Sequence, residues 1–403
     1  MHIIDIPQFI KTHITKRDKS LFENDINQYQ DQLTANIKGK SVLVIGGAGT
    51  IGSSYIKAIL NFEPARLYVV DTNENGLTEL TRDLRSKHGQ YIPEDYKTYP
   101  MNFGDEVFRK MFVNEGPFHI VANFAAHKHV RSEKDHYSIE AMIDNNVFKA
   151  KEFLDLLVTY KPEHFFCVST DKAANPVNVM GASKKLMEED IMAYSSHIKI
   201  TTARFANVAF SNGSLLDGYI QRLFKKQPIS CPSDVKRFFV SPEESGQICM
   251  LACILGASGE IYFPKLEEDQ MVNFKDITLD FFKEMAIPVV ECISDDDARN
   301  KATSMSIEDP HPVYFFTSDT SGEKLYEEFY TDTDEVDMIK YEGMGVIKNA
   351  VKPSKTQIEN CINELQMLMQ SDAYDKSAIV SLMKKHLPDF EHIETGKSLD
   401  QKM

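Results

Sequence analysis

Residues 41–60 read "SVLVIGGAGTIGSSYIKAIL", and this stretch decides the fold. A short apolar run predicts a buried strand, the glycines predict a tight turn, and the apolar residues that follow predict a helix. Gly46 allows the turn, Gly49 lets the backbone approach a pyrophosphate, and Gly52 permits close packing of the helix on the strand. The N-terminus of the helix then faces negatively charged phosphates.

An acidic residue supports the interpretation of this turn as a dinucleotide site. Asp71 ends the next apolar run, "RLYVVD", and its carboxylate suits the hydroxyls of a ribose while repelling a 2′-phosphate, which favours NAD over NADP. Asn102 follows a third strand, where an adenine contact is expected. A glycine-rich turn without a ligand stays open as the alternative. The predicted cofactor-binding residues are Gly46, Gly49, Thr50, Ile51, Gly52, Asp71, Asn102, Ala125 and Lys184.

Further apolar runs extend the strand-to-helix pattern along the chain. "HIVANFAAHKHV" begins at residue 119 and "EHFFCVSTDKA" at residue 163. Continuous apolar strands separated by helical stretches indicate a parallel sheet that is covered on both faces. We therefore predict an α/β fold of the Rossmann type, with a doubly wound parallel sheet. The predicted division is a helical leader (1–40), a dinucleotide-binding domain (41–210), a smaller mixed substrate lobe interleaved with it (211–345) and a helical extension (346–403).

Two segments beyond the predicted sheet carry more local predictions. The tail has apolar residues at helical spacing, so we expect a helix that packs against another part of the protein. These residues are Ile358, Ile362, Leu365 and Leu368. The acidic stretch "SDDDARNK" (294–301) is predicted to be a solvated loop.

Composition excludes several classes of protein. The 403 residues carry a net charge of −15 without a long basic run, so nucleic acid and anionic membranes are poor partners, although a local basic pocket for a phosphate is compatible. No apolar stretch is long enough to span a membrane, and the first residues lack the order of a signal peptide. We therefore expect a cytoplasmic protein. No C-x-x-C pair occurs, Cys249 and Cys253 are predicted to be buried thiols, and the H-x-H of His127 and His129 lacks a third ligand, so no metal is predicted.

The segment "STDKAANPVNVMGASKK" (169–185) follows a predicted strand. Ligands of parallel sheets lie at the carboxyl ends of strands, which places Asp171 and Lys172 where chemistry occurs. A surface ion pair or a helix cap is the alternative for these two residues. Lys184 stands four residues after Met180, in a spacing at which short-chain dehydrogenase/reductases carry a Tyr and a Lys. A thioether cannot transfer a proton, so either the acid and base are elsewhere or the protein is not an enzyme.

Several motifs occur together in one order: "GGAGTIG", "ANFAAHKHV", "NNVF", "STDKAANPVNVMGASK", "RFANV", "KRFFVSPEES" and "SGEKLYEEF". Over roughly residues 40–330 the chain resembles the UDP-N-acetylglucosamine 4,6-dehydratases of polysaccharide biosynthesis, which are extended short-chain dehydrogenase/reductases. Ala206 and Asn212 depart from the family's usual "RFGNV" and "SRGS". Met in place of Tyr also occurs in this family, so Met180 marks a subgroup.

The resemblance implies that the Thr-Asp-Lys run supplies the acid and base. Lys172 is the candidate base for the sugar C5 proton and must be neutral to act. Asp171 is the candidate acid toward the C6 hydroxyl, either already protonated or after taking the C4 hydroxyl proton. Thr170 would bind the C4 oxygen, Lys184 the nicotinamide ribose, and Met180 would fill space beside the sugar.

Two sets of residues are candidate substrate contacts. His127, Lys128 and His129 follow the strand "IVANFAA" and would line the sugar site. The resemblance implies that Asn207 and Arg237 lie near the nucleotide diphosphate, for which the fixed donors of arginine are suited. A surface salt bridge is the alternative for Arg237.

Three further residues match positions of the family. Asn146 would order the backbone near Lys184 or cap a loop. Glu323 and Lys324 match a family segment without an assigned role.

These observations predict a NAD-dependent nucleotide-sugar 4,6-dehydratase that acts on UDP-N-acetylglucosamine. The product would be a UDP-2-acetamido-2,6-dideoxy-4-hexulose, and Met180 resembles the branch that retains the C5 configuration. A homo-oligomer, a dimer or larger, is expected. A C4 epimerase or keto-sugar reductase is the second interpretation, and a non-catalytic scaffold that binds NAD or a nucleotide sugar is the third.

Overall fold

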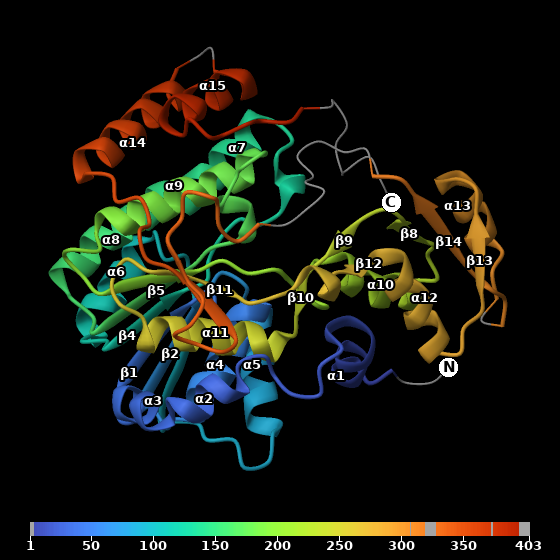
Figure 1. The fold of residues 1–403 in the computed structure, drawn as a ribbon, viewed down its shortest axis with the longest axis horizontal. Helices are drawn as coiled ribbons and strands as arrows, with labels where there is room; N and C mark the ends of the chain where they lie inside the picture. The colour runs from blue at the N-terminus through green and yellow to red at the C-terminus, as the bar shows by residue number, and fades with distance from the viewer. Residues whose placement is uncertain (1–3, 307, 319–327, 372–373, 395–403) are drawn as a thin grey trace.

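The computed structural model describes residues 4–306, 308–318, 328–371 and 374–394. Its centre is a sheet whose strands follow the order β15-β16-β11-β6-β5-β4-β1-β2-β3 (Figure 1). These strands are β1 (Ser41–Ile45), β2 (Arg66–Asp71), β3 (Asp95–Pro100), β4 (Ile120–Asn123), β5 (His164–Val168), β6 (Ile200–Ala203), β11 (Ile261–Pro264), β15 (Val336–Asp337) and β16 (Met344–Ile347). The pairs from β11 to β3 are parallel, and β16 and β15 add two antiparallel pairs at one edge.

Helices cover both faces of this sheet because successive apolar residues of each strand point to opposite sides. Val42 and Val44 belong to one buried cluster, whereas Leu43 and Ile45 belong to the other. The first face is covered by α4 (Thr50–Leu60), α5 (Glu74–Ser86) and α11 (Pro242–Leu255). The second face is covered by α6 (Glu106–Glu115), α8 (Lys149–Thr159) and α9 (Val179–Ala193).

The register of the parallel strands brings three loops to one edge of the sheet. Ile45 pairs with Asn123, and Asn123 pairs with Cys167. The turn after β1, the loop after β4 and the segment after β5 therefore emerge side by side, where parallel sheets bind ligands.

A second lobe lies beside the sheet, with β10 between them in Figure 1. Its core strands β13, β14 and β8 are parallel. The strands of this region are β7 (Asn207–Val208), β8 (Ile229–Pro232), β9 (Lys236–Arg237), β10 (Phe239–Val240), β12 (Val272–Asn273), β13 (Val289–Cys292) and β14 (His311–Phe316). Its helices are α10 (Leu215–Phe224), η5 (Glu268–Gln270), α12 (Phe274–Glu284) and α13 (Asp295–Thr303).

The leader contacts both lobes. Its elements are α1 (Ile6–Phe9), the π-helix η1 (Ile10–Thr15), α2 (Glu23–Gln28) and α3 (Gln30–Ile37). Phe9, Ile10 and Ile14 are buried in the core of the second lobe, whereas Leu33 and Ile37 are buried under the central sheet. The leader thus crosses from one lobe to the other.

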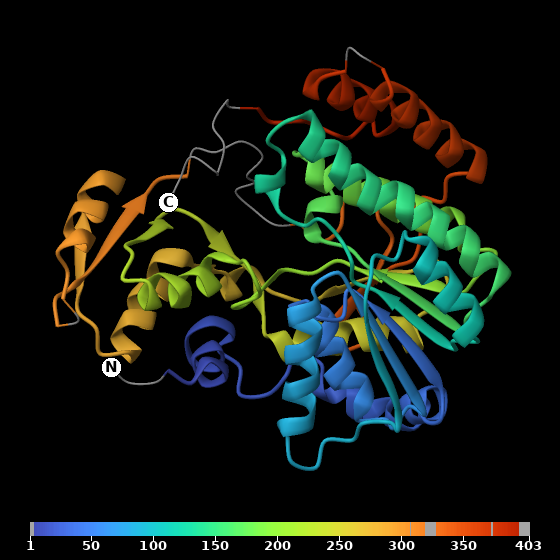
Figure 2. The ribbon, with the colours of Figure 1, turned by 180° about the vertical axis from the view of Figure 1, so that it is seen from behind.

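The C-terminal helices pack on the outer side of α9, as Figure 2 shows from behind. They are α14 (Lys355–Met369) and α15 (Lys376–His386), and they share a buried cluster with α7 (His136–Ile143) and the π-turn η3 (Asp144–Phe148). Ile358, Ile362 and Leu365 are buried in this cluster and Leu368 is partly buried, as their helical spacing predicted.

The predicted fold class is confirmed, and one local prediction is wrong. The acidic stretch 294–301 forms most of α13, because Ser294 caps the helix and three aspartates occupy its first turn, where negative charge is favourable. Cys249 and Cys253 are buried thiols on α11, as predicted. Within the described residues, no helix is long and apolar enough to cross a membrane. Strands β11, β15 and β16 complete the central sheet although they follow residue 210.

Candidate active site

The glycine-rich turn after β1 fits a group from outside the chain. A Cβ on Gly46, whose φ is 75°, would lie 2.5 Å from the Ala125 nitrogen, and a Cβ on Gly52 would lie 2.3 Å from the Gly46 oxygen. A Cβ on Gly49 would find nothing nearer than the same oxygen at 3.5 Å, an ordinary contact. The protein itself therefore excludes side chains at 46 and 52 but not at 49. The open space at Gly49 is what a bound pyrophosphate requires.

The N-terminus of α4 adds donors to this space. Gly49 is its N-cap and offers no side chain to its first amides, those of Thr50, Ile51 and Gly52. Such a terminus favours a phosphate. The Thr50 hydroxyl accepts a hydrogen bond of 2.9 Å from the Asn212 amide, which ties this turn to the loop before α10.

Asp71 is fixed beside the turn. Its carboxylate accepts hydrogen bonds of 2.9 Å from the amides of Ala48 and Asn73. Asn102 lies nearby, because the amide of Met101 bonds the Asp71 carbonyl, but the Asn102 side chain accepts from Gly104 within its own turn. The predicted dinucleotide residues of the first three strands are thus gathered at one edge.

The predicted catalytic segment (169–185) begins where β5 ends and forms the short turn η4 (Asp171–Ala173). Asp171 is 4% exposed, and its carboxylate accepts a hydrogen bond of 2.6 Å from the Thr170 hydroxyl. The Lys172 ammonium lies 3.2 Å from the same carboxylate. The Lys172 side chain is 31% exposed, so the pair has a buried acid and an accessible amine.

Lys184 and Met180 lie on α9 and are buried. The Lys184 ammonium donates to the Val168 carbonyl at 2.7 Å, at the end of β5, and lies 3.2 Å from the Met187 sulfur. Burial lowers the pKa of Lys184, and the nearby Cys167 thiol opposes that shift. Met180 is 2% exposed and presents no group to the pocket described below.

Asn146 joins the loop after β4 to α9. Its side chain accepts from the His127 amide at 2.8 Å and donates to the His127 carbonyl at 3.0 Å and the Ser183 hydroxyl at 3.1 Å. Ser183 precedes Lys184. Asn146 therefore holds the backbone at His127 and links it to the Ser183 hydroxyl, next to Lys184.

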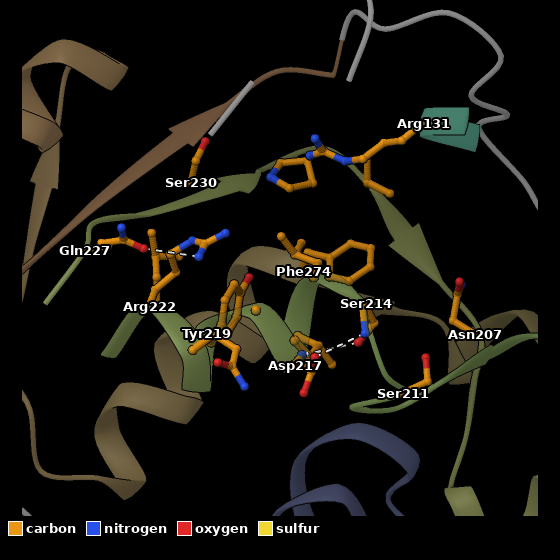
Figure 3. Close-up of a pocket in the computed structure, with 18 of the residues that line it drawn as sticks. Arg131, Asn207, Ser211, Ser214, Asp217, Tyr219, Arg222, Gln227, Ser230 and Phe274 are labelled. Atoms are coloured by element: carbon orange, nitrogen blue, oxygen red, sulfur yellow. Dashed lines mark hydrogen bonds between the residues drawn. The ribbon is translucent and has the colours of Figure 1, made fainter. Parts of the chain in front are cut away.

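A pocket of about 1110 Å³ lies between this edge of the sheet and the second lobe (Figure 3). Five of the predicted site residues line it: Lys128, His129, Lys172, Asn207 and Arg237. Figure 3 shows Arg131 and Ser230 on one side, with Ser214 and Asp217 on the opposite side. Glu323 and Lys324 lie outside the described residues.

The charge of the pocket is strongly positive. Among its described lining residues, Asp217 is the single acid, against eight lysines and arginines: Lys128, Arg131, Lys172, Arg222, Lys225, Lys226, Arg237 and Arg299. The pocket walls and the neighbouring Lys128 and Arg131 lower the pKa of His129, which keeps its ring neutral. In a protein with a net charge of −15, such a pocket is suited to an anion.

Sequence reasoning missed part of this pocket. Arg222 lies on α10, Lys225 and Lys226 follow the end of that helix, and Arg299 lies on α13, within a stretch dominated by acids. "FKKQP" at the end of an amphipathic helix was a local signal for the two lysines. Nothing local singles out Arg299, because its position depends on how α13 packs.

One group of metal-ligating side chains lies away from the pocket. Within the described ranges, Glu133, His392 and Glu394 bring ligand atoms to within 4.8 Å of one another. The Lys376 ammonium lies 3.1 Å from Glu133 and 2.5 Å from Glu394. Both carboxylates therefore already form ion pairs with a lysine side chain.

Comparison with known proteins identifies the family. Residues 42–349 match the sequence model of the family described as "Polysaccharide biosynthesis protein". An uncharacterized membrane protein of Methanocaldococcus jannaschii is 30% identical over 333 residues, which cover 81% of this chain and 89% of that protein. A UDP-N-acetylglucosamine 4,6-dehydratase (inverting) of Campylobacter jejuni is 26% identical over 58% of this chain and 70% of that enzyme.

Other relatives are longer than this chain. It spans 38% and 46% of the polysaccharide biosynthesis proteins of Bacillus subtilis and Staphylococcus aureus that it matches. Among solved structures, Pen from Bacillus thuringiensis has the same fold, with a TM-score of 0.62 at 21% identity over 82% of this chain and 99% of that one. The family predicted from the sequence motifs is thereby confirmed, and the chain belongs to the polysaccharide biosynthesis protein family.

Proposed function

We propose that this chain is a NAD-dependent nucleotide-sugar 4,6-dehydratase that converts UDP-N-acetylglucosamine into UDP-2-acetamido-2,6-dideoxy-4-hexulose. The observation that carries the proposal is the Asp171–Lys172 pair at the end of β5. The Lys172 side chain of this pair lines a cationic pocket. Membership of the family and the name of the Campylobacter relative support it.

The residues around β1 and β2 fit NAD. When bound, NAD supplies a hydride acceptor for C4 of the sugar and gives the hydride back at C6. Gly49 and the N-terminus of α4 would hold its pyrophosphate, and the fixed carboxylate of Asp71 would bind its adenine ribose.

The pocket residues hold the substrate. Arg131 and Arg237 would bind the diphosphate, since guanidinium groups match phosphate oxygens with two donors each. Lys128 would add charge from the loop after β4. With the diphosphate anchored there, the sugar would lie at the Lys172 end of the pocket.

The two residues of the pair divide the proton transfers. The Asp171 carboxylate, with Thr170 bonded to it, accepts the proton of the C4 hydroxyl and later donates that proton to the departing C6 hydroxyl. Lys172 removes the C5 proton, which the C4 ketone has made acidic, and returns a proton to C5. One water leaves, and Asp171 finishes as the carboxylate with which it began. Lys172 finishes as the neutral amine that removed the C5 proton, and it regains from solvent the proton that it lost before the reaction. Met180 takes no part, because a thioether cannot transfer a proton.

Lys172 must lose its proton before it can act as a base. Its ion pair with Asp171 favours the ammonium, and neutralisation of Asp171 by the C4 proton removes that stabilisation. The exposed third of the Lys172 side chain gives solvent access to the amine. Acceptance of the C4 proton by Asp171 thus prepares Lys172 for the next step.

A dehydratase explains the pair better than a C4 epimerase does. Epimerisation needs oxidation and hydride return at C4 but no base at C5 and no acid at C6. Retention of the C5 configuration is proposed from Met180 alone, whereas the Campylobacter relative is named as inverting. A homo-oligomer is also part of the proposal and follows from the family resemblance.

The test incubates purified, NAD-loaded protein with UDP-N-acetylglucosamine without added reductant. Mass spectrometry and proton NMR should show the loss of one water, a C6 methyl doublet and the configuration at C5. An epimer of unchanged mass would replace the proposal with an epimerase. Unchanged substrate across a panel of UDP-sugars, with the protein folded and loaded, would favour a scaffold.

A further inference from the structure

The chain's C-terminal tail lies against the entry to the catalytic helix. The Glu391 amide donates to the Pro176 carbonyl at 3.2 Å, and the Ile393 amide donates to the Val177 carbonyl at 2.9 Å. Pro176 and Val177 directly precede Asn178, the N-cap of α9. The tail therefore pairs, backbone to backbone, with the two residues that lead into the helix carrying Met180 and Lys184.

A side-chain network reinforces this contact, with Glu133 at its centre. One carboxylate oxygen of Glu133 accepts a hydrogen bond of 2.7 Å from the Val179 amide, the first residue of α9. The other lies 2.5 Å from Nε2 of His392, in the tail, and 3.1 Å from the Lys376 ammonium, at the start of α15. The side chains of Glu133 and His392 are only 7% and 9% exposed. A carboxylate at a helix N-terminus is favourable, and two donors from the tail region hold it there.

The first turn of α9 touches the proposed base. A Cβ on Gly181 would lie 2.6 Å from the Lys172 carbonyl oxygen, so the helix backbone packs directly on the backbone of Lys172. A small shift of this turn must move Lys172. Glu133 also closes the short helix η2 (Val130–Ser132), because its amide donates to the Val130 carbonyl at 3.0 Å. Arg131 of the pocket lies in that helix.

We propose that His392 and Lys376 are positioning residues for the reaction: they hold Glu133, which fixes the first turn of α9 and thereby places Lys172. The effect on turnover rests on the proposed function, whereas the effect on the order of the helix end does not. The match to the family model covers residues 42–349, so Glu133 and α9 lie within the matched region, whereas His392 and Lys376 lie beyond it.

The chain offers a matched control for His392. His386 also bonds a glutamate, Glu364, at 3.0 Å, and this pair joins α15 to α14, whereas the His392 pair joins the tail to the start of α9. His392→Ala and His386→Ala each remove one histidine–carboxylate pair from the same C-terminal region. His392→Gln serves as the conservative variant, because its amide can donate from nearly the position of Nε2.

The first readout is amide hydrogen exchange of the full-length, NAD-loaded protein, which needs no turnover. His392→Ala should raise exchange in residues 176–181 by about tenfold or more while the central strands keep their protection. His386→Ala should leave that segment unchanged, and His392→Gln should restore most of its protection. Unchanged exchange in His392→Ala, or an equal rise in His386→Ala, would overturn the proposal.

The second readout is the dehydration of UDP-N-acetylglucosamine. His392→Ala should lower kcat about tenfold or more, because misplacement of a catalytic group by about 1 Å can cost more than that. KM should change less, since Asn146 independently holds the backbone at His127. A drop in kcat shared by His386→Ala would mean that the C-terminal helices act through stability alone, against the proposal. Inactivity of the wild-type protein would refute the proposed function, and the exchange result would still decide whether His392 orders the helix end.

Discussion

The glycine-rich turn and the proposed catalytic segment (169–185) emerge side by side from one edge of the sheet, yet they are built in different ways. The turn is shaped by its own backbone: Gly46 and Gly52 leave no room for side chains, and its neighbours come from adjacent strands. The catalytic segment depends on distant side chains. Asn146 holds its helix from one side, and Glu133, with His392 of the tail, holds its N-terminus.

This difference decides what each region can tolerate. A site made of backbone amides is lost only when the backbone or the space before it is changed. A site made of paired side chains can be lost without any change in fold, by substitution of one partner or of a remote support. Substitutions in one region should therefore leave the other region intact.

The largest effect is expected for Lys172→Met. Loss of the base should lower kcat by about 10²–10⁴-fold. Because Lys172 lies outside the glycine-rich turn, bound NAD and the melting temperature should stay at wild-type levels. Steady-state kinetics, cofactor absorbance after extraction and thermal unfolding measure these quantities. Lys225→Met, which removes another pocket lysine, at the C-terminal end of α10, is the control, and comparable turnover in the two variants would contradict the role of Lys172.

Gly49→Val should separate cofactor binding from folding. The valine side chain would enter the space proposed for the pyrophosphate, so NAD affinity should fall by about tenfold or more, while the apoprotein stays as stable as wild type. Gly46→Val should instead destabilise the protein by about 1–3 kcal/mol, because its Cβ would collide with the backbone at Ala125. Calorimetric titration with NAD and denaturant unfolding distinguish the two. Equal loss of stability at both positions would show that Gly49 serves the fold alone.

Arg237→Met tests the cationic pocket. Removal of one proposed diphosphate contact should raise KM for the UDP-sugar by about tenfold with a smaller change in kcat. Affinity for UDP alone should fall by a similar factor and become less dependent on salt. Arg82→Met, on the exposed surface of α5, is the control for the loss of an arginine. An unchanged KM would favour the surface salt-bridge interpretation of Arg237.

The smallest effect is expected for Glu189, a partly buried residue of α9. Burial raises the pKa of Glu189, on α9, to about 7, although Lys185 opposes the shift. The folded state therefore prefers the neutral acid, and this contribution to stability is lost as pH rises from about 4.5 to about 7. Between those values the melting temperature of the wild type should fall by a few degrees relative to Glu189→Gln. The exposed Glu79→Gln should follow the wild type at every pH, and parallel curves for all three would contradict the shift.

Sequence patterns predicted the parts of the structure that depend on residues close together in the chain. The alternation of apolar strands and helices predicted the doubly wound sheet, and the spacing of Gly46, Gly49 and Gly52 predicted a turn with open space at the middle glycine. The charge content of residues 294–301 predicts a solvated loop, and this prediction is wrong because Ser294 caps a helix whose first turn carries three aspartates.

Local sequence patterns could not predict contacts between segments that lie far apart in the chain. Nothing near His392 indicates that its ring bonds Glu133, 259 positions earlier in the chain. Arg299 reaches the pocket only because α13 packs on the strand β14. Such contacts follow from the packing of whole elements, so the pair Asp171–Lys172 could be named from sequence, whereas the groups that hold it in place could not.

The most direct test of the central claim follows the C4 hydrogen. UDP-N-acetylglucosamine carrying deuterium at C4 is incubated with the NAD-loaded protein, and the product is examined by mass spectrometry and NMR. The account predicts loss of one water and deuterium in the C6 methyl group, because the hydride taken from C4 returns within the same active site. Deuterium retained at C4 of an epimer, or a dehydrated product without deuterium at C6, would contradict it.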